Sequence, residues 1–303
     1  MAINRIAYFA QSGTVRTNPV SPFTGSGYYI LPINSANIEV TRPIEAVTTF
    51  GQFAALNQAQ TNVTTCKCSM KGYLGTGAGV TGLDANVIND IISTTQTGTI
   101  IVSVSPQGFS MTGICTNIGL DISVGGFGMF DLGFAGVGQP VVADASTSAT
   151  VAATNTFTLS PVTTMSIGSS GLLTGASATS IKFSYDLPTD TLTALGENPN
   201  ATQGNLNSII ATKAPYKASM SVEGFGVNVM INDVVITSGL SIGNIALVLP
   251  KAKVTSRSFN NAAGQASATF SYSAEDVSAT FSVTGIGAYS QNNLAQASPT
   301  WGA

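Results

Sequence analysis

The segment IEVTRPIEAVTTFGQF (residues 38–53) has a counterpart later in the chain, IKFSYDLPTDTLTALGEN (residues 181–198). Four positions are matched at a constant separation of 145 residues: Pro43 with Pro188, Glu45 with Asp190, Thr48 with Thr193, and Gly51 with Gly196. Matches at a constant separation indicate an internal repeat, and such a repeat determines which domain organisation is expected.

Four further matches follow in the same order along the chain. They pair CKCSMKGY (66–73) with ASMSVEGF (218–225), VINDII (87–92) with MINDVV (230–235), IIVSVSP with NIALVLP, and LGFAGVG (132–138) with FSVTGIG (281–287). This collinear set predicts a tandem duplication of one fold of about 150 residues. We assign residues 1–140 to a first domain with an N-terminal arm. Residues 141–303 form a second domain with a linker and a C-terminal tail.

Within each copy the dominant period is two. Ala266, Ala268, Phe270 and Tyr272 alternate with small hydroxyl residues, and Phe109, Met111 and Cys115 are expected to share one face of another strand. Alternation of this kind is typical of half-buried antiparallel strands. Residues 84–94 have apolar side chains at helical spacing with Asp84 as N-cap. The sequence therefore predicts a mainly β fold: two small antiparallel β-sandwiches or barrels, each with about one flanking helix.

The composition excludes several classes of function. The 303-residue chain is 44% hydrophobic but only 8% charged, it has no histidine, and its formal net charge is −3. Mechanisms that need imidazole are excluded, and no run of basic residues is present to bind nucleic acid tightly. The glycine-rich segment at residues 122–142 is predicted to form buried strands, not a membrane helix. The short apolar patch at residues 6–10 predicts no signal peptide.

Few residues could carry chemistry. Asp121 with Asp131, or Glu275 beside Asp276, could act as paired carboxylates, although solvation of strand edges and turns explains them better. Cys66 and Cys68 share a strand face and, like Cys115, are predicted to be buried thiols, because the chain offers no second pair of metal ligands. We expect no enzyme activity, no cofactor and no metal site.

The acids matched by the repeat are more informative. Asp90 and Asp233 fit a helix-surface or capping role, or a lumen or interface role; Glu45 and Asp190 each open a long polar segment just after a proline. Matched acids of this kind could face DNA or pair with basic residues of a neighbour. We predict long loops at residues 45–62 and 190–213.

In these features the chain resembles bacteriophage tail tube (major tail) proteins of the duplicated-domain type. The resemblance rests on the β-rich unit of about 150 residues with one helix, the matched strand–loop–strand blocks, and the uncharged, histidine-free composition. It implies homotrimeric rings that stack into a tube, with the long loops reaching the adjacent ring. Glu45, Phe50, Phe53, Asp190 and Asn198 are then candidate stacking residues.

The resemblance also implies a location and a set of partners. The location is the virion tail, with assembly in the host bacterial cytoplasm. The partners are the tape measure, terminator and baseplate proteins and, in some tails, a sheath. DNA passes through the tube without specific binding, and no membrane is involved. The alternatives are another virion structural protein (sheath, neck or capsid-associated) and a surface-layer or adhesin-like β protein.

Overall fold

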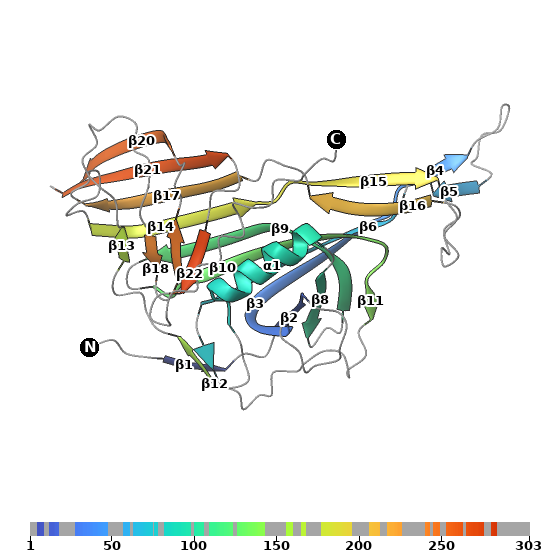
Figure 1. Ribbon diagram of the computed structural model, residues 1–303, viewed down its shortest axis with the longest axis horizontal. Coiled ribbons are helices and arrows are strands. Elements are labelled where there is room, and N and C mark those ends of the chain that lie inside the picture. Colours follow the sequence, from blue (N-terminus) through green and yellow to red (C-terminus); the bar gives the residue numbers. More distant parts are fainter. Residues whose placement is uncertain are drawn as a thin grey trace.

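The computed structural model describes residues 5–8, 12–17, 28–47, 57–60, 63–74, 76–77, 82–97, 100–105, 109–123, 126–142, 156–159, 165–167, 177–195, 206–212, 217–225, 240–242, 245–248, 253–262, 265–275 and 280–283. Over these residues the chain is mostly antiparallel β-sheet with one helix, α1 (Ala85–Thr97) (Figure 1). The predicted mainly β class is thereby confirmed.

The first half of the chain and the predicted linker contain short strands near the N-terminus and longer strands in the main sheet. They are β1 (Arg5–Tyr8), β2 (Ser12–Arg16), β3 (Tyr28–Thr41), β4 (Ile44–Val47), β5 (Asn57–Gln60), β6 (Thr65–Tyr73), β7 (Thr76–Gly77), β8 (Ile100–Ser105), β9 (Phe109–Ser123), β10 (Met129–Val137), β11 (Val141–Val142) and β12 (Thr156–Leu159). Two of them belong to the predicted linker: β11 pairs with β9, and β12 pairs with β1.

The later strands continue the same antiparallel pattern. They are β13 (Met165–Ile167), β14 (Ser177–Asp186), β15 (Thr189–Leu195), β16 (Leu206–Thr212), β17 (Lys217–Phe225), β18 (Leu240–Ile242), β19 (Ile245–Val248), β20 (Lys253–Ala262), β21 (Gln265–Glu275) and β22 (Thr280–Val283). The segment matched to α1 in the second copy, residues 230–239, has Val and Ile residues that also favour a strand, and it lies outside the described residues.

Two arrangements organise these strands. In the first half the pairings form a closed circuit, β2–β3–β6–β10–β9–β8–β2, as in a small barrel. In addition, β9 pairs with β14, so one row of eight strands runs β3-β6-β10-β9-β14-β17-β21-β20 across the predicted domain boundary. This row is visible in Figure 1 as the fan that continues from β9 and β14 to β20.

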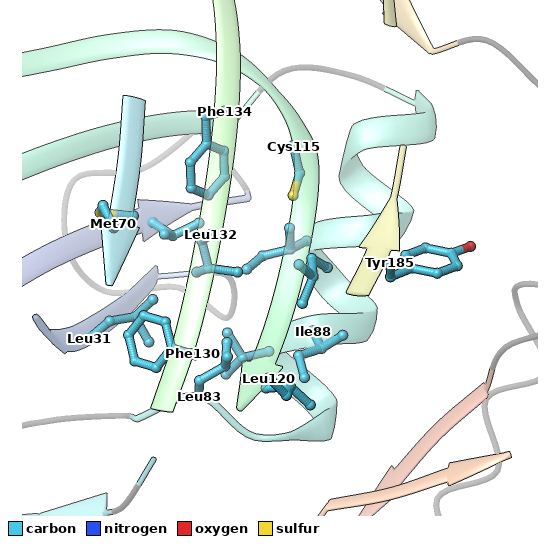
Figure 2. Packing of buried hydrophobic residues seen from close by; sticks show 14 of the residues in the cluster. Leu31, Met70, Leu83, Ile88, Cys115, Leu120, Phe130, Leu132, Phe134 and Tyr185 are labelled. Atoms are coloured by element: carbon cyan, nitrogen blue, oxygen red, sulfur yellow. The ribbon is translucent and has the colours of Figure 1, made fainter. Parts of the chain in front are cut away.

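Side-chain alternation explains which face of the row is buried. On β6, Cys66, Cys68 and Met70 are buried while Lys67 and Lys71 are exposed, as the sequence predicts. Figure 2 shows apolar side chains of β10 and α1 pointing into one interior. The predicted inward position of Phe109 is wrong: its side chain is 41% exposed, because β9 begins at an open end of the circuit.

Helix α1 closes this core. Val87, Ile88, Ile91 and Ile92 are fully buried, and α1 lies against β8 and β9. The predicted N-cap is confirmed, since the Asp84 side chain accepts a hydrogen bond from the Val87 backbone N–H at 2.9 Å. The sequence placed this helix at residues 84–94, and the structure extends it to Thr97.

The two predicted long loops are, in their described parts, β-hairpins. β4 pairs with β5, and β15 pairs with β16. For these described parts the prediction of loops is wrong: it gave weight to polar composition, whereas the Thr, Leu and Ile residues of β15 and β16 favour extended pairing.

Candidate functional site

The open face of the eight-strand row carries small polar residues and charges of alternating sign. Several opposite charges of the described strands face each other across neighbouring strands, whereas Glu223 and Lys253 face hydroxyl residues. The register pairs are Glu39 with Lys67, Lys71 with Asp131, Asp121 with Lys182, and Asp186 with Lys217. Directly opposed residues of an antiparallel pair lie on the same face, so these charges form cross-strand pairs.

Two of these pairs are ion pairs. Lys71 Nζ lies 3.2 Å from Asp131 Oδ2, and Lys182 Nζ lies 3.5 Å from Asp121 Oδ2. All four side chains remain substantially exposed, so each pair contributes about 0.2–1 kcal/mol at most. Their main effect is therefore on the field above the face, because neighbouring positive and negative charges largely cancel at a distance.

These ion pairs also bear on the candidate carboxylate pair. Asp131 stands opposite Gly119, and Asp121 stands opposite Met129, so neither carboxylate is in register with the other. Each interacts with a lysine instead. Glu275 ends β21 opposite Lys217, and Asp276 lies outside the described residues. The carboxylates thus belong to the charge pattern of the sheet face.

A shallow hollow of about 400 Å³ lies on this open face. Its lining includes Asn37, Glu39, Lys67, Thr116 and Thr189. No group of three metal-ligating side chains occurs among the described residues. Within the same part of the chain, no helix has the length and apolarity needed to cross a bilayer.

The second feature is the outer edge of β3. Beyond its bend near Ile33, β3 pairs with β6 on one side, and no described strand occupies the other side. Val40 is 46% exposed at this edge. A groove of about 360 Å³ lies beside it, lined by Ile38, Val40, Phe109, Gln139 and Pro140. An apolar groove next to an open strand edge is suited to bind another extended segment.

The other end of the row is also open in the described structure, where β20 pairs with β21 alone. Among the described strands, the row therefore has two open edges, which differ in sequence and lie at opposite ends. Such edges suit head-to-tail contacts between copies of one chain, because the two contacting surfaces differ.

Both hairpins leave the row at the same end. Four successive antiparallel pairings separate β3 from β14, so these two strands run in the same direction. β4–β5 follows β3 and β15–β16 follows β14, and Figure 1 shows both hairpins extending to the right. Glu45 and Asp190 are exposed at the bases of these hairpins. Phe50, Phe53 and Asn198 lie outside the described residues.

The acid of α1 has partners inside the chain. Asp90 Oδ2 accepts hydrogen bonds from the Thr17 hydroxyl and from the Tyr29 hydroxyl, the latter at 2.8 Å. Burial raises the pKa of Tyr29, and the hydrogen bond to Asp90 and the charges of Asp90 and Asp84 add to this. Asp90 thus connects α1 to β3 and to the end of β2, an internal role that sequence reasoning missed because the partners are far apart in the chain. Asp233, its match, lies outside the described residues.

The three cysteines are buried free thiols, as predicted. Burial raises the pKa of Cys66, and it raises the pKa of Cys68 and of Cys115 to about 12. A thiol reacts through its thiolate, which is scarce at neutral pH under these conditions.

We therefore expect Cys66, Cys68 and Cys115 to react with a maleimide or with Ellman's reagent at least tenfold more slowly in the native protein than in the urea-unfolded chain. Stopped-flow or mass-spectrometric labelling measures this ratio. Rapid native labelling, or a disulfide-linked dimer on a non-reducing gel, would contradict the prediction.

No protein-family model and no curated protein sequence matches the chain.

Proposed function

We propose that this protein is a structural virion component of the tail-tube type, whose rings stack into the conduit for genome ejection. The observation that carries the proposal is the eight-strand row, in which β3 beyond Ile33 and β20 have no described strand on their outer sides. The row divides into two matched sets, β3-β6-β10-β9 and β14-β17-β21-β20. The matched segments support this division, because residues 66–73 and 218–225 fall on β6 and β17, which occupy corresponding places.

Under the proposed duplication, strand order favours a different match for β10 from the one that the sequence gives. Residues 281–287 were matched to residues 132–138 of β10, yet β22 pairs with β19 and not with β17. By its place beside β17, β21 is the counterpart of β10. A short Gly-rich motif is weak support for a match, because glycines recur in many turns and strands.

The junction inside the chain provides a pattern for contacts between chains. β9 ends the first set and pairs antiparallel with β14, which begins the second. A neighbouring chain that repeated this step would place its β3 beside β20, in the same antiparallel sense. Repetition of a head-to-tail contact closes a ring when the rotation permits. Three chains with two matched sets each give a ring with pseudo-sixfold character.

Burial at matched positions supports this contact. Ile38 and Val40 correspond to Phe183 and Tyr185 at the separation of 145 residues. Phe183 and Tyr185 are buried where β14 lies beside β9, whereas Val40 is 46% exposed at the free edge of β3. A second chain at this edge would bury the apolar groove beside β3.

The open face suits a conduit for DNA. Four lysines of this face, Lys67, Lys71, Lys182 and Lys217, are each in register with a carboxylate, whereas Lys253 faces Ser273. Paired charges leave little net positive field to retain phosphates, so DNA can pass without being held. The proposed location is the virion tail, with tape measure, terminator and baseplate proteins as partners.

The hairpins are the proposed stacking elements between rings, because both project from the same end of the row. The segments that connect the two strands of each hairpin, called tips here, are residues 48–56 and 196–205, and their sequences include Phe50, Phe53 and Asn198. Glu45 and Asp190 lie at their bases.

A shortened hairpin tests this function. Val47 and Asn57 face each other in register, so an Asn-Gly turn can replace residues 48–56 and leave β4–β5 intact. We expect the wild-type chain to form hollow tubes of uniform width, and the variant to form rings but no long tubes. Negative-stain electron microscopy compares them, with the same turn between Leu195 and Leu206 testing the second tip.

Two outcomes would contradict the proposal. Wild-type protein that stays monomeric at all concentrations would rule out the tube function. Tubes of normal length from both shortened variants would be consistent with the tube function but would show that the tips are not its stacking elements.

A further inference from the structure

The second hairpin rests on the first half of its own chain. β16 contacts β9, β10 and α1. At the base of this hairpin the backbone N–H of Leu187 donates to the carbonyl oxygen of Thr116 at 2.9 Å, which extends the β14–β9 ladder toward the hairpin. The β15–β16 hairpin therefore links the second half of the chain to β9 and β10 of the first half.

The first hairpin has the same place in the chain but no such support. Ile44 is 47% exposed, and Glu45 and Ala46 are exposed as well. In the described structure β4 packs on β5 and has no comparably extensive contact with another element. The two hairpins correspond in register, since Glu45 faces Ala59 where Asp190 faces Ala211.

We propose that the base of β4–β5 clasps β20 and β21 of a second copy of this chain, as β15–β16 clasps β9 and β10 within one chain. The inference rests on the proposed ring, in which the neighbour's β20 lies beside β3. β20 and β21 occupy the places of β9 and β10 in the second set of strands. The base of the hairpin thus acts within a ring.

The strand register indicates which ends of the second copy's β20 and β21 contact the base of β4–β5. The row ends on the hairpin side at Asp186, which faces Lys217, and Lys217 in turn faces Glu275. The contact therefore involves the C-terminal end of β21 and the adjoining N-terminal end of β20, where Lys253 faces Ser273.

Photo-crosslinking tests the clasp. Benzoylphenylalanine is placed at Ala59 or, as the matched control, at Ala211, and assembled protein is irradiated, digested and analysed by mass spectrometry. We expect Ala211 to crosslink within its chain to residues 85–97, 109–123 or 129–137. Ala59 is expected to crosslink between chains, to residues 253–275. Isotope-mixed assemblies distinguish the two kinds of product.

A second variant makes the result independent of crosslinking chemistry. Ile44→Asp should leave the urea midpoint of the monomer unchanged, because the side chain is already half exposed, and raise the critical concentration for ring formation at least tenfold. The control is Ser123→Asp, an exposed position at the opposite end of β9.

Each outcome decides the inference. Crosslinks from Ala59 to any other segment, or Ile44→Asp rings that form at the wild-type concentration, overturn the clasp and leave the tube function standing. Wild-type protein that forms no ring at any concentration overturns both.

Discussion

Replacing Gly72 by alanine is expected to lower the free energy of unfolding by about 3 kcal/mol or more. A Cβ atom at Gly72 would lie 2.1 Å from the carbonyl oxygen of Pro32 and 2.5 Å from Cζ of Phe130. The first is a backbone atom, and Phe130 is itself packed in the core, so neither can move away cheaply. The expected loss is a large part of the stability of an ordinary domain.

The large expected loss of stability in Gly72→Ala follows from the closed circuit of strands. Gly72 pairs with Ile33 of β3 on one side and with Phe130 of β10 on the other, next to the irregular register between Ile33 and Ser35. Urea unfolding followed by far-ultraviolet circular dichroism measures the change. Ser69→Ala, on the open face of the same strand, serves as control and should shift stability by no more than about 0.5 kcal/mol. An unchanged midpoint for Gly72→Ala would show that the circuit does not close as described.

Val40→Lys is expected to abolish ring formation while leaving the monomer folded. The side chain is 46% exposed in the single chain, so the substitution should cost the fold about 0.5 kcal/mol or less. In a ring the lysine would be buried without a partner against β20 of the next chain. Burial of an unpaired charge costs several kcal/mol, and each 1.4 kcal/mol weakens association tenfold.

Analytical ultracentrifugation over a range of concentrations measures this effect, with at least a hundredfold loss of association expected. Asn37→Lys is the matched control, because it adds the same charge to the same strand on the open face. Should Val40→Lys associate as tightly as Asn37→Lys, the edge of β3 is not the contact between copies.

Local pattern was enough to predict the strand faces and the first helix. The alternation in CKCSMKGY placed Cys66, Cys68 and Met70 inside and the lysines outside, and the structure confirms this. Asp84 was identified as an N-cap from its position before an apolar helical pattern, and its hydrogen bond to Val87 confirms it. The strand faces and the N-cap both depend on residues a few positions apart in the chain, so the local sequence pattern is enough to predict them.

Features that depend on distant partners could not be predicted. The carboxylate of Asp90 meets Tyr29, 61 residues away, and no periodicity encodes that contact. The pairing of β9 with β14 likewise joins distant segments, so the continuous row was not expected. Composition pointed to loops at residues 45–62, whereas pairing between β4 and β5 makes the described part a hairpin.

The pairing of charges on the open face also depends on distant partners and could not be predicted. The chain's low content of charged residues does not indicate where its lysines lie, and only strand register shows that Lys71 and Lys182 lie against carboxylates. Register depends on the full set of strand pairings, since a slip of one residue would move every side chain to the other face.

The most direct test is a cryo-electron microscopy reconstruction of the assembled protein, in which the chains of one ring are counted and the strand beside β20 is identified. The proposed function predicts three chains per ring, with β20 of each chain paired antiparallel to β3 of the next and the paired charges of the open face lining the lumen. A ring of six chains, or a ring in which the edges of β3 and β20 face solvent, would contradict it.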